Sequence, residues 1–364
     1  MEEKNQSCMV YIGTYTQHES EGIYAFRFDI ATGKIKSMGL MAKAENPSYI
    51  TFDHSRQHLY AVYETEDYKD RCGGAVGAYS IQAQSGNLLF LNEQSVLGRG
   101  PCHLCVEDKM KAVITANYTD GSLSVFRQNN DGSIGDMTDY VQHAGCGLDK
   151  VRQEMAHAHY VTFTPDQKYI YAVDLGIDQV KVYNLNTCNH TLEEVKELVF
   201  TMKGGSGPRH IAFHPKLSLF YLVNELSSEI MVFDTVAEGH PALLQTISTL
   251  PDSYRAENLC AAIKITPDGR FLYVSNRGHD SLAGFQIDKQ SGKLELISHT
   301  SSGGNWPRDL EIDPYGKWIL VANQESNEIT AFQIQGETGI LKPKGRIAKL
   351  SKPVCIKMME LTCL

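Results

Sequence analysis

The sequence predicts an all-β protein, namely a seven-bladed β-propeller with four antiparallel strands in each blade. Two observations lead to this prediction. One unit of strand-forming segments recurs along the 364 residues, and partial units at the two termini complete each other. The segments show period-2 or continuous apolar patterns, which are typical of strands, and no strong period of 3.6 residues occurs.

The repeated unit is clearest between residues 207 and 234. Its three segments are Gly207-Pro-Arg-His-Ile-Ala-Phe-His-Pro215, Leu219-Phe-Tyr-Leu-Val-Asn-Glu225 and Glu229-Ile-Met-Val-Phe-Asp234. Turns of the Pro-Asp-Gly type separate such runs, and a fourth, more polar strand completes a unit of roughly 50 residues, as in a propeller blade. Further copies start near Pro47, Pro101, His159, Ala262 and Arg308.

The two termini carry complementary parts of a seventh unit. Met9–Thr14 and Gly22–Phe28 match its second and third strands, and Pro353–Met359 matches the missing first strand. Pairing these ends in one blade removes the open edges of the sheet, which are a liability for a β protein. We therefore expect a single domain over residues 1–364. A β-sandwich followed by a second domain would leave the partial units unexplained.

Composition excludes several classes of partner. The net charge of −9 and the pI of about 5.8 argue against nucleic acid, which needs a basic surface. No apolar run reaches the length of a membrane span, and the first residues lack the apolar core of a signal peptide. Nine irregularly spaced cysteines fit reduced thiols. We expect a cytoplasmic monomer or weak homo-oligomer, although a chain whose export signal had been removed would look the same.

Hairpin pairing predicts which residues share one edge of the blades. The first two strands of each unit fold back on each other, so the start of the first meets the end of the second. This places Arg209 roughly opposite Asn224. The same folding back brings Pro47 to Glu64, Cys102 to Asn117, His159 to Asp174 and Arg308 to Asn323, and it brings Asn258 near Arg277. We expect these edges to face one mouth of the central channel.

The residues at this mouth are rich in arginine, histidine and carboxylate side chains. Such a set suits a small anionic ligand and supports general acid–base chemistry. The candidate catalytic residues are His157, His159, Arg209, Glu225 and Arg277, and the candidate substrate-binding residues are Tyr15, His103, Arg152, Asp174 and Arg308. Two alternatives stay open: Arg209 and Glu225 could form a structural salt bridge, and Asp174 could hold a histidine or a backbone group.

Metal and cofactor signals are weak, and we expect neither. Cys102-His-Leu-Cys105 lacks a second cysteine pair, and its two thiols would point to opposite faces of a strand. His157-Ala-His159 places two imidazoles on one face but has no obvious third ligand. Neither a phosphate-binding loop, a dinucleotide-binding fingerprint nor a nucleophile elbow occurs in the sequence.

At these residues the chain resembles the seven-bladed-propeller lactonase family, which includes cycloisomerase-type 6-phosphogluconolactonases and the fungal 3-carboxy-cis,cis-muconate lactonizing enzyme. The motifs that carry the resemblance span the chain: Tyr11-Ile-Gly-Thr-Tyr15, Asn46-Pro-Ser48, Gly100-Pro-Cys-His103, Arg152-Gln153, His157-Ala-His159, Asp174-Leu-Gly-Ile-Asp178, Gly207-Pro-Arg-His210, Val223-Asn-Glu-Leu-Ser-Ser228, Ser275-Asn-Arg-Gly-His-Asp-Ser281 and Asn305-Trp-Pro-Arg308.

The resemblance implies an active site with a histidine, two arginines and a glutamate. By motif position these are His157 or His159, Arg209, Arg277 and Glu225. Glu154-Met-Ala stands before His157 where relatives commonly have a proline, which leaves open which histidine points inward. The expected activity is hydrolysis of 6-phospho-D-glucono-1,5-lactone, a small anionic sugar-phosphate lactone. A carboxymuconate-type cycloisomerase and a non-catalytic binding propeller are the alternatives.

Overall fold

The computed structural model describes residues 7–107, 109–235 and 240–361 and is built almost entirely of β-strands. Within these ranges there is no α-helix, and one 3-10 turn, η1, spans Lys196–Leu198. The strands form seven antiparallel sheets in which four strands follow one another in the order of a propeller blade, beside a separate two-stranded hairpin. The predicted all-β, seven-bladed fold class is confirmed.

The chain divides into two compact units. The first comprises Met1–Leu40 and His210–Leu364, and the second comprises Met41–Arg209. Strands β3 and β19 cross the two points of division. The expectation of one domain over residues 1–364 stays a prediction. No helix in the described ranges is long and apolar enough to cross a membrane.

Four sheets lie in the first unit. The terminal sheet contains β3 (Ile35–Lys43), β2 (Gly22–Asp29), β1 (Ser7–Thr14) and β31 (Pro353–Glu360). The next contains β19 (Pro208–Phe213), β20 (Leu219–Asn224), β21 (Glu229–Asp234) and β22 (Ala242–Ser248). The third contains β23 (Leu259–Ile265), β24 (Phe271–Arg277), β25 (Ser281–Ile287) and β26 (Leu294–Ser301). The fourth contains β27 (Pro307–Ile312), β28 (Trp318–Asn323), β29 (Glu328–Ile334) and β30 (Leu341–Lys349).

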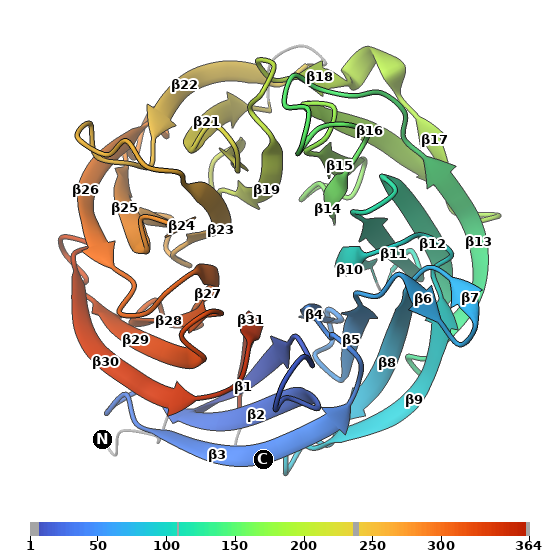
Figure 1. Ribbon diagram of the computed structural model, residues 1–364, viewed down its shortest axis with the longest axis horizontal. Helices are drawn as coiled ribbons and strands as arrows, with labels where there is room; N and C mark the ends of the chain where they lie inside the picture. The colour runs from blue at the N-terminus through green and yellow to red at the C-terminus, as the bar shows by residue number, and fades with distance from the viewer. Residues whose placement is uncertain (1–6, 108, 236–239, 362–364) are drawn as a thin grey trace. The chain divides into compact units, whose positions relative to one another are not determined.

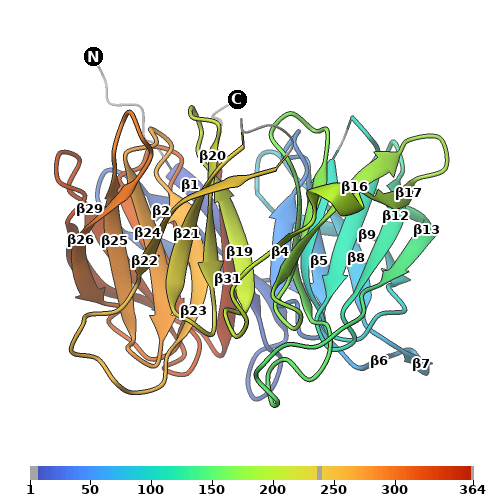
Figure 2. The ribbon, with the colours of Figure 1, turned by 90° about the horizontal axis from the view of Figure 1, so that it is seen from above.

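Three sheets lie in the second unit. The first contains β4 (Tyr49–Phe52), β5 (His58–Tyr63), β8 (Ala75–Ile81) and β9 (Leu88–Ser95). The second contains β10 (Pro101–Glu107), β11 (Ala112–Asn117), β12 (Ser122–Gln128) and β13 (Ile134–Gln142). The third contains β14 (Ala158–Phe163), β15 (Ile170–Asp174), β16 (Gln179–Asn186), β17 (Thr191–Glu194) and the added strand β18 (Phe200–Thr201). A small hairpin, β6 (Asp67–Tyr68) with β7 (Arg71–Cys72), extends from one end of this unit's strands (Figure 2).

The two termini pair in one sheet, as the sequence predicts. Strand β31 runs antiparallel to β1 from Cys8 opposite Glu360 to Thr14 opposite Pro353, with one irregularity at Gly13. Figure 1 shows red β31 beside blue β1, β2 and β3. The C-terminal strand thus supplies the first strand of a blade whose other strands open the chain.

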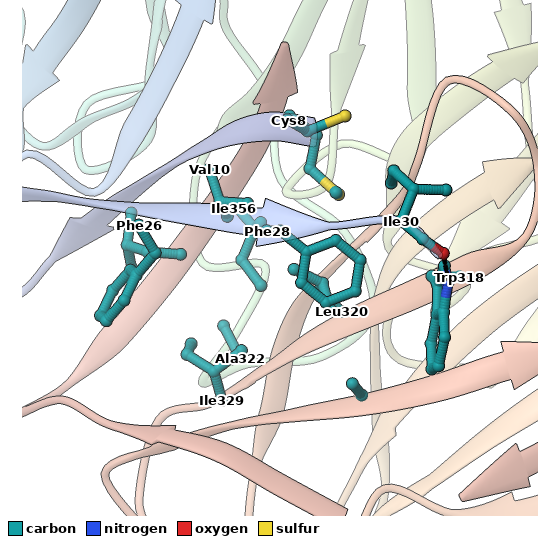
Figure 3. Close-up of a cluster of buried hydrophobic side chains, with 13 residues drawn as sticks. Cys8, Val10, Phe26, Phe28, Ile30, Trp318, Leu320, Ala322, Ile329 and Ile356 are labelled. Atoms are coloured by element: carbon teal, nitrogen blue, oxygen red, sulfur yellow. Dashed lines mark hydrogen bonds between the residues drawn. The ribbon is translucent and has the colours of Figure 1, made fainter. Parts of the chain in front are cut away.

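A hydrophobic cluster joins this terminal sheet to the neighbouring sheet (Figure 3). Val10, Phe28 and Ile356 of the terminal sheet pack with Trp318 and Leu320 of β28. The Phe28 and Trp318 rings meet edge to face with centroids 5.7 Å apart, an arrangement that the ring quadrupoles favour. The side chains of both β1 and β31 are therefore needed to bury the apolar face of the terminal sheet against β28.

The second strand of each blade is the most deeply buried. Strands β11, β20, β24 and β28 are buried over their whole length, whereas outer strands such as β30 are largely exposed. A strand buried on both faces needs a continuous apolar run and not an alternating one. This explains why runs such as Leu219–Val223 are the clearest part of the repeat.

Successive blades are linked by hydrogen bonds from buried aromatic side chains. The Tyr221 hydroxyl donates to the Gly292 carbonyl at 2.8 Å, and the Tyr273 hydroxyl donates to the Gly339 carbonyl at 2.6 Å. In the second unit, Tyr60 donates in the same way to the Gly132 carbonyl at 2.7 Å. Each acceptor lies in the turn before the outer strand of the following blade, so the link repeats with the fold.

Replacing Tyr273 with Phe should lower the free energy of unfolding by about 1–3 kcal/mol, because the Gly339 carbonyl loses its buried donor. Thermal or chemical unfolding of the two proteins measures this difference. Tyr140, which is 38% exposed, provides the matched control, since its hydroxyl has water as an alternative partner. An equal loss in Tyr273→Phe and Tyr140→Phe would mean that the link between blades contributes nothing.

Candidate active site

The first strands of several blades carry a β-bulge close to their start. Register shifts occur between Pro101 and His103, between Ala158 and Tyr160, and between Pro307 and Asp309. The strand partners of Asn117, Asp174 and Asn323 are therefore Pro101, Ala158 and Pro307. The sequence-based placement of Cys102, His159 and Arg308 opposite those three residues was displaced by one position. A bulge adds one residue to a strand, and the alternation of apolar residues in the sequence does not show where this residue is added.

The bulge has a consequence for the side chains. A bulged residue leaves the ladder, and its side chain can be aimed differently from its neighbours. In β10, β14 and β27 the bulged residues are Cys102, His159 and Arg308, of which the last two are candidate site residues. Arg209 follows Pro208 in β19, the same place in the repeat that Arg308 holds after Pro307.

In the second unit, Tyr118 organises three of the candidate residues. Its ring stacks on the His157 ring with centroids 4.5 Å apart and an interplanar angle of 16°. The same ring meets His159 edge to face at 5.4 Å. Its hydroxyl accepts a hydrogen bond from the Arg152 guanidinium at 3.3 Å. Tyr118 directly follows Asn117 at the end of β11, which is the place in the repeat that Glu225 and Arg277 hold after Asn224 and Asn276.

The His157 ring is buried, and each of its nitrogens faces an acceptor. Nδ1 lies 2.8 Å from the Tyr118 carbonyl oxygen, so Nδ1 carries a proton. Nε2 lies 3.3 Å from Oε1 of Glu154, whose side chain is half exposed. A hydrogen bond from the backbone N–H of Glu154 itself, followed by the one from the His157 ring, lowers the pKa of the Glu154 carboxyl.

Asp174 fixes the backbone around His157. Its side chain is completely buried, and Oδ1 accepts hydrogen bonds from the backbone N–H groups of His157 (2.7 Å) and Gly176 (3.0 Å). Its Oδ2 lies 2.7 Å from Nδ1 of His143, whose Nε2 is 3.0 Å from the Tyr183 hydroxyl. Asp174 therefore holds a histidine and a backbone group, as the sequence left open, and a part in substrate binding stays a prediction.

His159 and His103 have different surroundings from His157. The Cys102 sulfur lies 3.8 Å from His159 Nδ1 and 3.5 Å from the His159 carbonyl oxygen. His103 is buried between the rings of Tyr49 and Tyr160, with both centroid distances at 4.0 Å, and its Nδ1 accepts from the Val161 N–H. These contacts tie His103 into the packing of β4, β10 and β14.

In the first unit, Glu225 and Arg277 form a buried ion pair. The Arg277 guanidinium lies 2.7 Å from Oε2 of Glu225, and the two side chains are 5% and 2% exposed. Arg277 also donates to the carbonyl oxygens of Leu259 (3.3 Å) and Cys260 (2.9 Å). Its guanidinium lies 5.7 Å from the Trp306 ring centroid, a cation–π contact. Charged side chains are almost never fully buried unless they are paired, and here each charge meets its opposite.

A buried polar network supports the segment that carries Arg277. The Asn258 amide donates to Ser228 Oγ (2.9 Å) and Asn276 Oδ1 (3.2 Å). Asn276 in turn accepts from Thr249 at 2.9 Å. Burial raises the pKa of the adjacent Cys260 thiol to about 11, which keeps that thiol neutral at ordinary pH. The network fixes β23 against β24 next to the ion pair.

Arg308 and Tyr15 form a second cationic group in the first unit. The Arg308 guanidinium donates to the Tyr15 hydroxyl at 2.8 Å and lies 5.2 Å from the centroid of the same ring. The backbone of Tyr15 is anchored by its N–H, which donates to the Lys352 carbonyl at 3.0 Å. Two candidate substrate-binding residues are thus brought together, from the β27 bulge and from the loop after β1.

The structure brings the candidate residues together in three groups: Arg152, His157 and His159 around Tyr118; Glu225 with Arg277; and Tyr15 with Arg308. Arg209 is buried on β19. That Arg209, Glu225, Arg277 and one histidine meet in one pocket stays a prediction. Sequence reasoning missed Tyr118, Trp306 and Glu154. The place of Tyr118 in the repeat, directly after Asn117, could have identified it. Trp306 lies within the motif Asn305-Trp-Pro-Arg308, and Glu154 directly follows the motif Arg152-Gln153.

Within residues 7–107, 109–235 and 240–361, no three His, Cys, Asp or Glu side chains are arranged to hold a metal ion. The eight cysteines in these ranges are free thiols, and Cys363 lies outside them.

Comparison with known proteins assigns the family. Residues 9–358 match the model of the lactonase family described as a 7-bladed β-propeller, so the chain belongs to this family of propeller lactonases. It is 40% identical to the 6-phosphogluconolactonase of Bacillus subtilis over 82% of this chain and 83% of that one.

Two solved structures show the same fold over nearly the whole chain. A protein from Bacteroides fragilis has a TM-score of 0.90 at 34% identity, with 99% of both chains covered. The periplasmic gluconolactonase PpgL of Pseudomonas aeruginosa has a TM-score of 0.92 at 30% identity, with 98% of this chain and 100% of that chain covered.

Proposed function

We propose that the protein hydrolyses 6-phospho-D-glucono-1,5-lactone to 6-phosphogluconate. The buried Glu225–Arg277 pair is the observation that carries the proposal, because it joins a candidate base to a cation within 2.7 Å. Membership of the lactonase family and the name of the Bacillus subtilis relative support the same reaction. The free thiols of the described residues favour a cytoplasmic location as part of the proposal.

The reaction needs a positioned water, a base, help for the oxyanion and an acid for the leaving group. In our proposal, Glu225 takes a proton from the water that attacks C1 of the lactone. Arg277 or Arg209 stabilises the negative charge that develops on the carbonyl oxygen. When the bond from C1 to the ring oxygen breaks, its electron pair goes to that oxygen, which a histidine protonates. The chemistry requires no redox cofactor.

Recognition of the phosphate is assigned to an arginine outside this group, either Arg308 or Arg152. A guanidinium matches the oxygens of a phosphate through paired hydrogen bonds. We favour Arg308, because its guanidinium donates to the Tyr15 hydroxyl and also lies 5.2 Å from the centroid of the Tyr15 ring. The Arg152 guanidinium donates to the Tyr118 hydroxyl at 3.3 Å.

A substrate comparison tests the proposal. We expect the protein to hydrolyse 6-phosphogluconolactone faster than gluconolactone without the phosphate. Arg308→Gln should lower kcat/KM for the phosphorylated lactone by about 10- to 100-fold, the scale of one charge-assisted hydrogen bond, and should affect the plain lactone less. Arg127→Gln, at an exposed position on β12, is the matched control.

Two outcomes would contradict the proposal. Lactonization of a 3-carboxymuconate without hydrolysis of either sugar lactone would favour a cycloisomerase. Binding of small anions with no turnover of any of the three substrates would favour a non-catalytic propeller.

A further inference from the structure

Two residues contact the His157 ring: Tyr118, which directly follows β11, and Glu154, which lies in the same segment before β14. Tyr118 covers one face of the ring and offers its carbonyl oxygen to Nδ1, and Glu154 offers a carboxylate oxygen to Nε2. The backbone of His157 is fixed independently by Asp174, and a side chain on Gly176 would collide with the Met155 carbonyl. Little freedom remains for the ring to turn.

The partners of the two ring nitrogens are both acceptors. A carbonyl oxygen and a carboxylate can only accept hydrogen bonds, so the arrangement gives a partner to each N–H of a protonated imidazole. The Nδ1 side is closed by a backbone group, whereas the Nε2 side is closed by a side chain that is half exposed and can move aside. A ring held in this way suits a group that delivers a proton from Nε2.

We infer that Tyr118 and Glu154 are positioning residues that hold His157 as the proton donor to the departing ring oxygen of the lactone. The inference rests on the proposed function and adds to it which histidine acts. In this step the C1–O bond breaks, the ring oxygen takes the electron pair and the Nε2 proton, and His157 regains a proton from solvent. Glu154 stabilises the protonated ring until the substrate oxygen replaces it.

The neighbours of His159 differ from those of His157. Its Nδ1 lies beside the Cys102 sulfur, and Tyr118 meets it edge to face. The charged or titratable groups that face His157 are Glu154 on the preceding loop, Asp174 on β15 through its backbone contact, and Arg152 and His159 across Tyr118. Among these, Glu154 is the one whose carboxylate meets a ring nitrogen of His157, so its charge should have the strongest effect on the protonated ring.

Kinetics of Glu154→Gln and Tyr118→Leu test the inference. Each should lower kcat for the lactone by about 10-fold or more with little change in KM, since general acid catalysis contributes about 10²–10⁴-fold and is only partly lost. Tyr118→Phe keeps the stacked ring and should restore much of the activity that Tyr118→Leu loses. Tyr140→Leu is the control for removal of a tyrosine in the same unit.

A second measurement separates this inference from the proposed function. The ¹⁵N spectrum of His157 should show a proton fixed on Nδ1 in the wild-type protein and also in Tyr118→Leu, because the backbone carbonyl that accepts this proton remains. A wild-type protein that hydrolyses no lactone but shows this spectrum would refute the function and not the positioning. Wild-type kcat in folded Tyr118→Leu and Glu154→Gln would overturn the inference. So would a chain in which His159→Gln abolishes turnover while His157→Gln does not.

Discussion

A chain that lacks residues 353–364 should lose its cooperative unfolding transition. The deletion removes β31, which pairs with β1 along its whole length and contributes Ile356 and Met358 to the cluster shared with β28. It leaves the β1 edge unpaired and opens an apolar surface, both of which favour aggregation. Calorimetry or circular dichroism during heating measures the transition.

The matched control is a chain shortened only by residues 362–364, which keeps β31 complete and should melt like the parent. A milder change tests the same contact without removing a strand. Ile356→Ala should lower the free energy of unfolding by about 2–5 kcal/mol, the usual range for truncating a buried Ile. A chain without residues 353–364 that melts like the parent would refute the closure of the fold through its termini.

Replacing Glu225 with Gln should lower turnover of the lactone by about 10²-fold or more, the usual scale for loss of a general base. Gln keeps the shape of the side chain and removes its charge. Product binding should survive, because the arginines remain. The change also leaves the buried Arg277 guanidinium without its carboxylate, a loss of about 3–5 kcal/mol in comparable buried pairs. Activity is therefore measured at a temperature at which circular dichroism shows the variant to be folded.

Arg209→Ala provides the comparison for Glu225→Gln. It should weaken substrate binding and turnover together, because it removes a cation without removing the proposed base. If folded Glu225→Gln hydrolyses the lactone at the parent rate, Glu225 is a structural partner of Arg277. The base must then be sought among the histidines and Asp174.

The fold could be predicted because its determinants are local. Apolar runs such as Leu219–Val223 and the turns between them recur in each blade. Pro353–Met359 supplies the first strand that the incomplete sequence repeat at the N-terminus lacks. The bulges at Cys102, His159 and Arg308 could not be predicted in this way. They depend on backbone angles that the apolar pattern leaves open, so the pairing at the strand ends was displaced by one residue.

The sequence predicted the charged residues of the candidate site, but it did not predict which residues contact them. The repeat places Glu225 and Arg277 at strand ends, and the structure pairs Arg277 with Glu225 as well as with two backbone carbonyls. The sequence analysis considered one hairpin at a time, so it weighed a salt bridge of Glu225 with Arg209 and did not consider Arg277 as a partner of Glu225. Tyr118 was missed because an aromatic residue after a turn asparagine carries no charge, although its contacts connect Arg152, His157 and His159.

Catalysis by Glu225 and Arg277 should make the wild-type protein hydrolyse 6-phosphogluconolactone faster than the lactone hydrolyses without catalyst. The initial rate of lactone loss in the presence of the wild-type protein tests this most directly. Folded Glu225→Gln at the same concentration and a sample without protein serve as the two blanks. We predict a wild-type rate far above both blanks, with 6-phosphogluconate as the product. A wild-type rate equal to the spontaneous rate would contradict the claim.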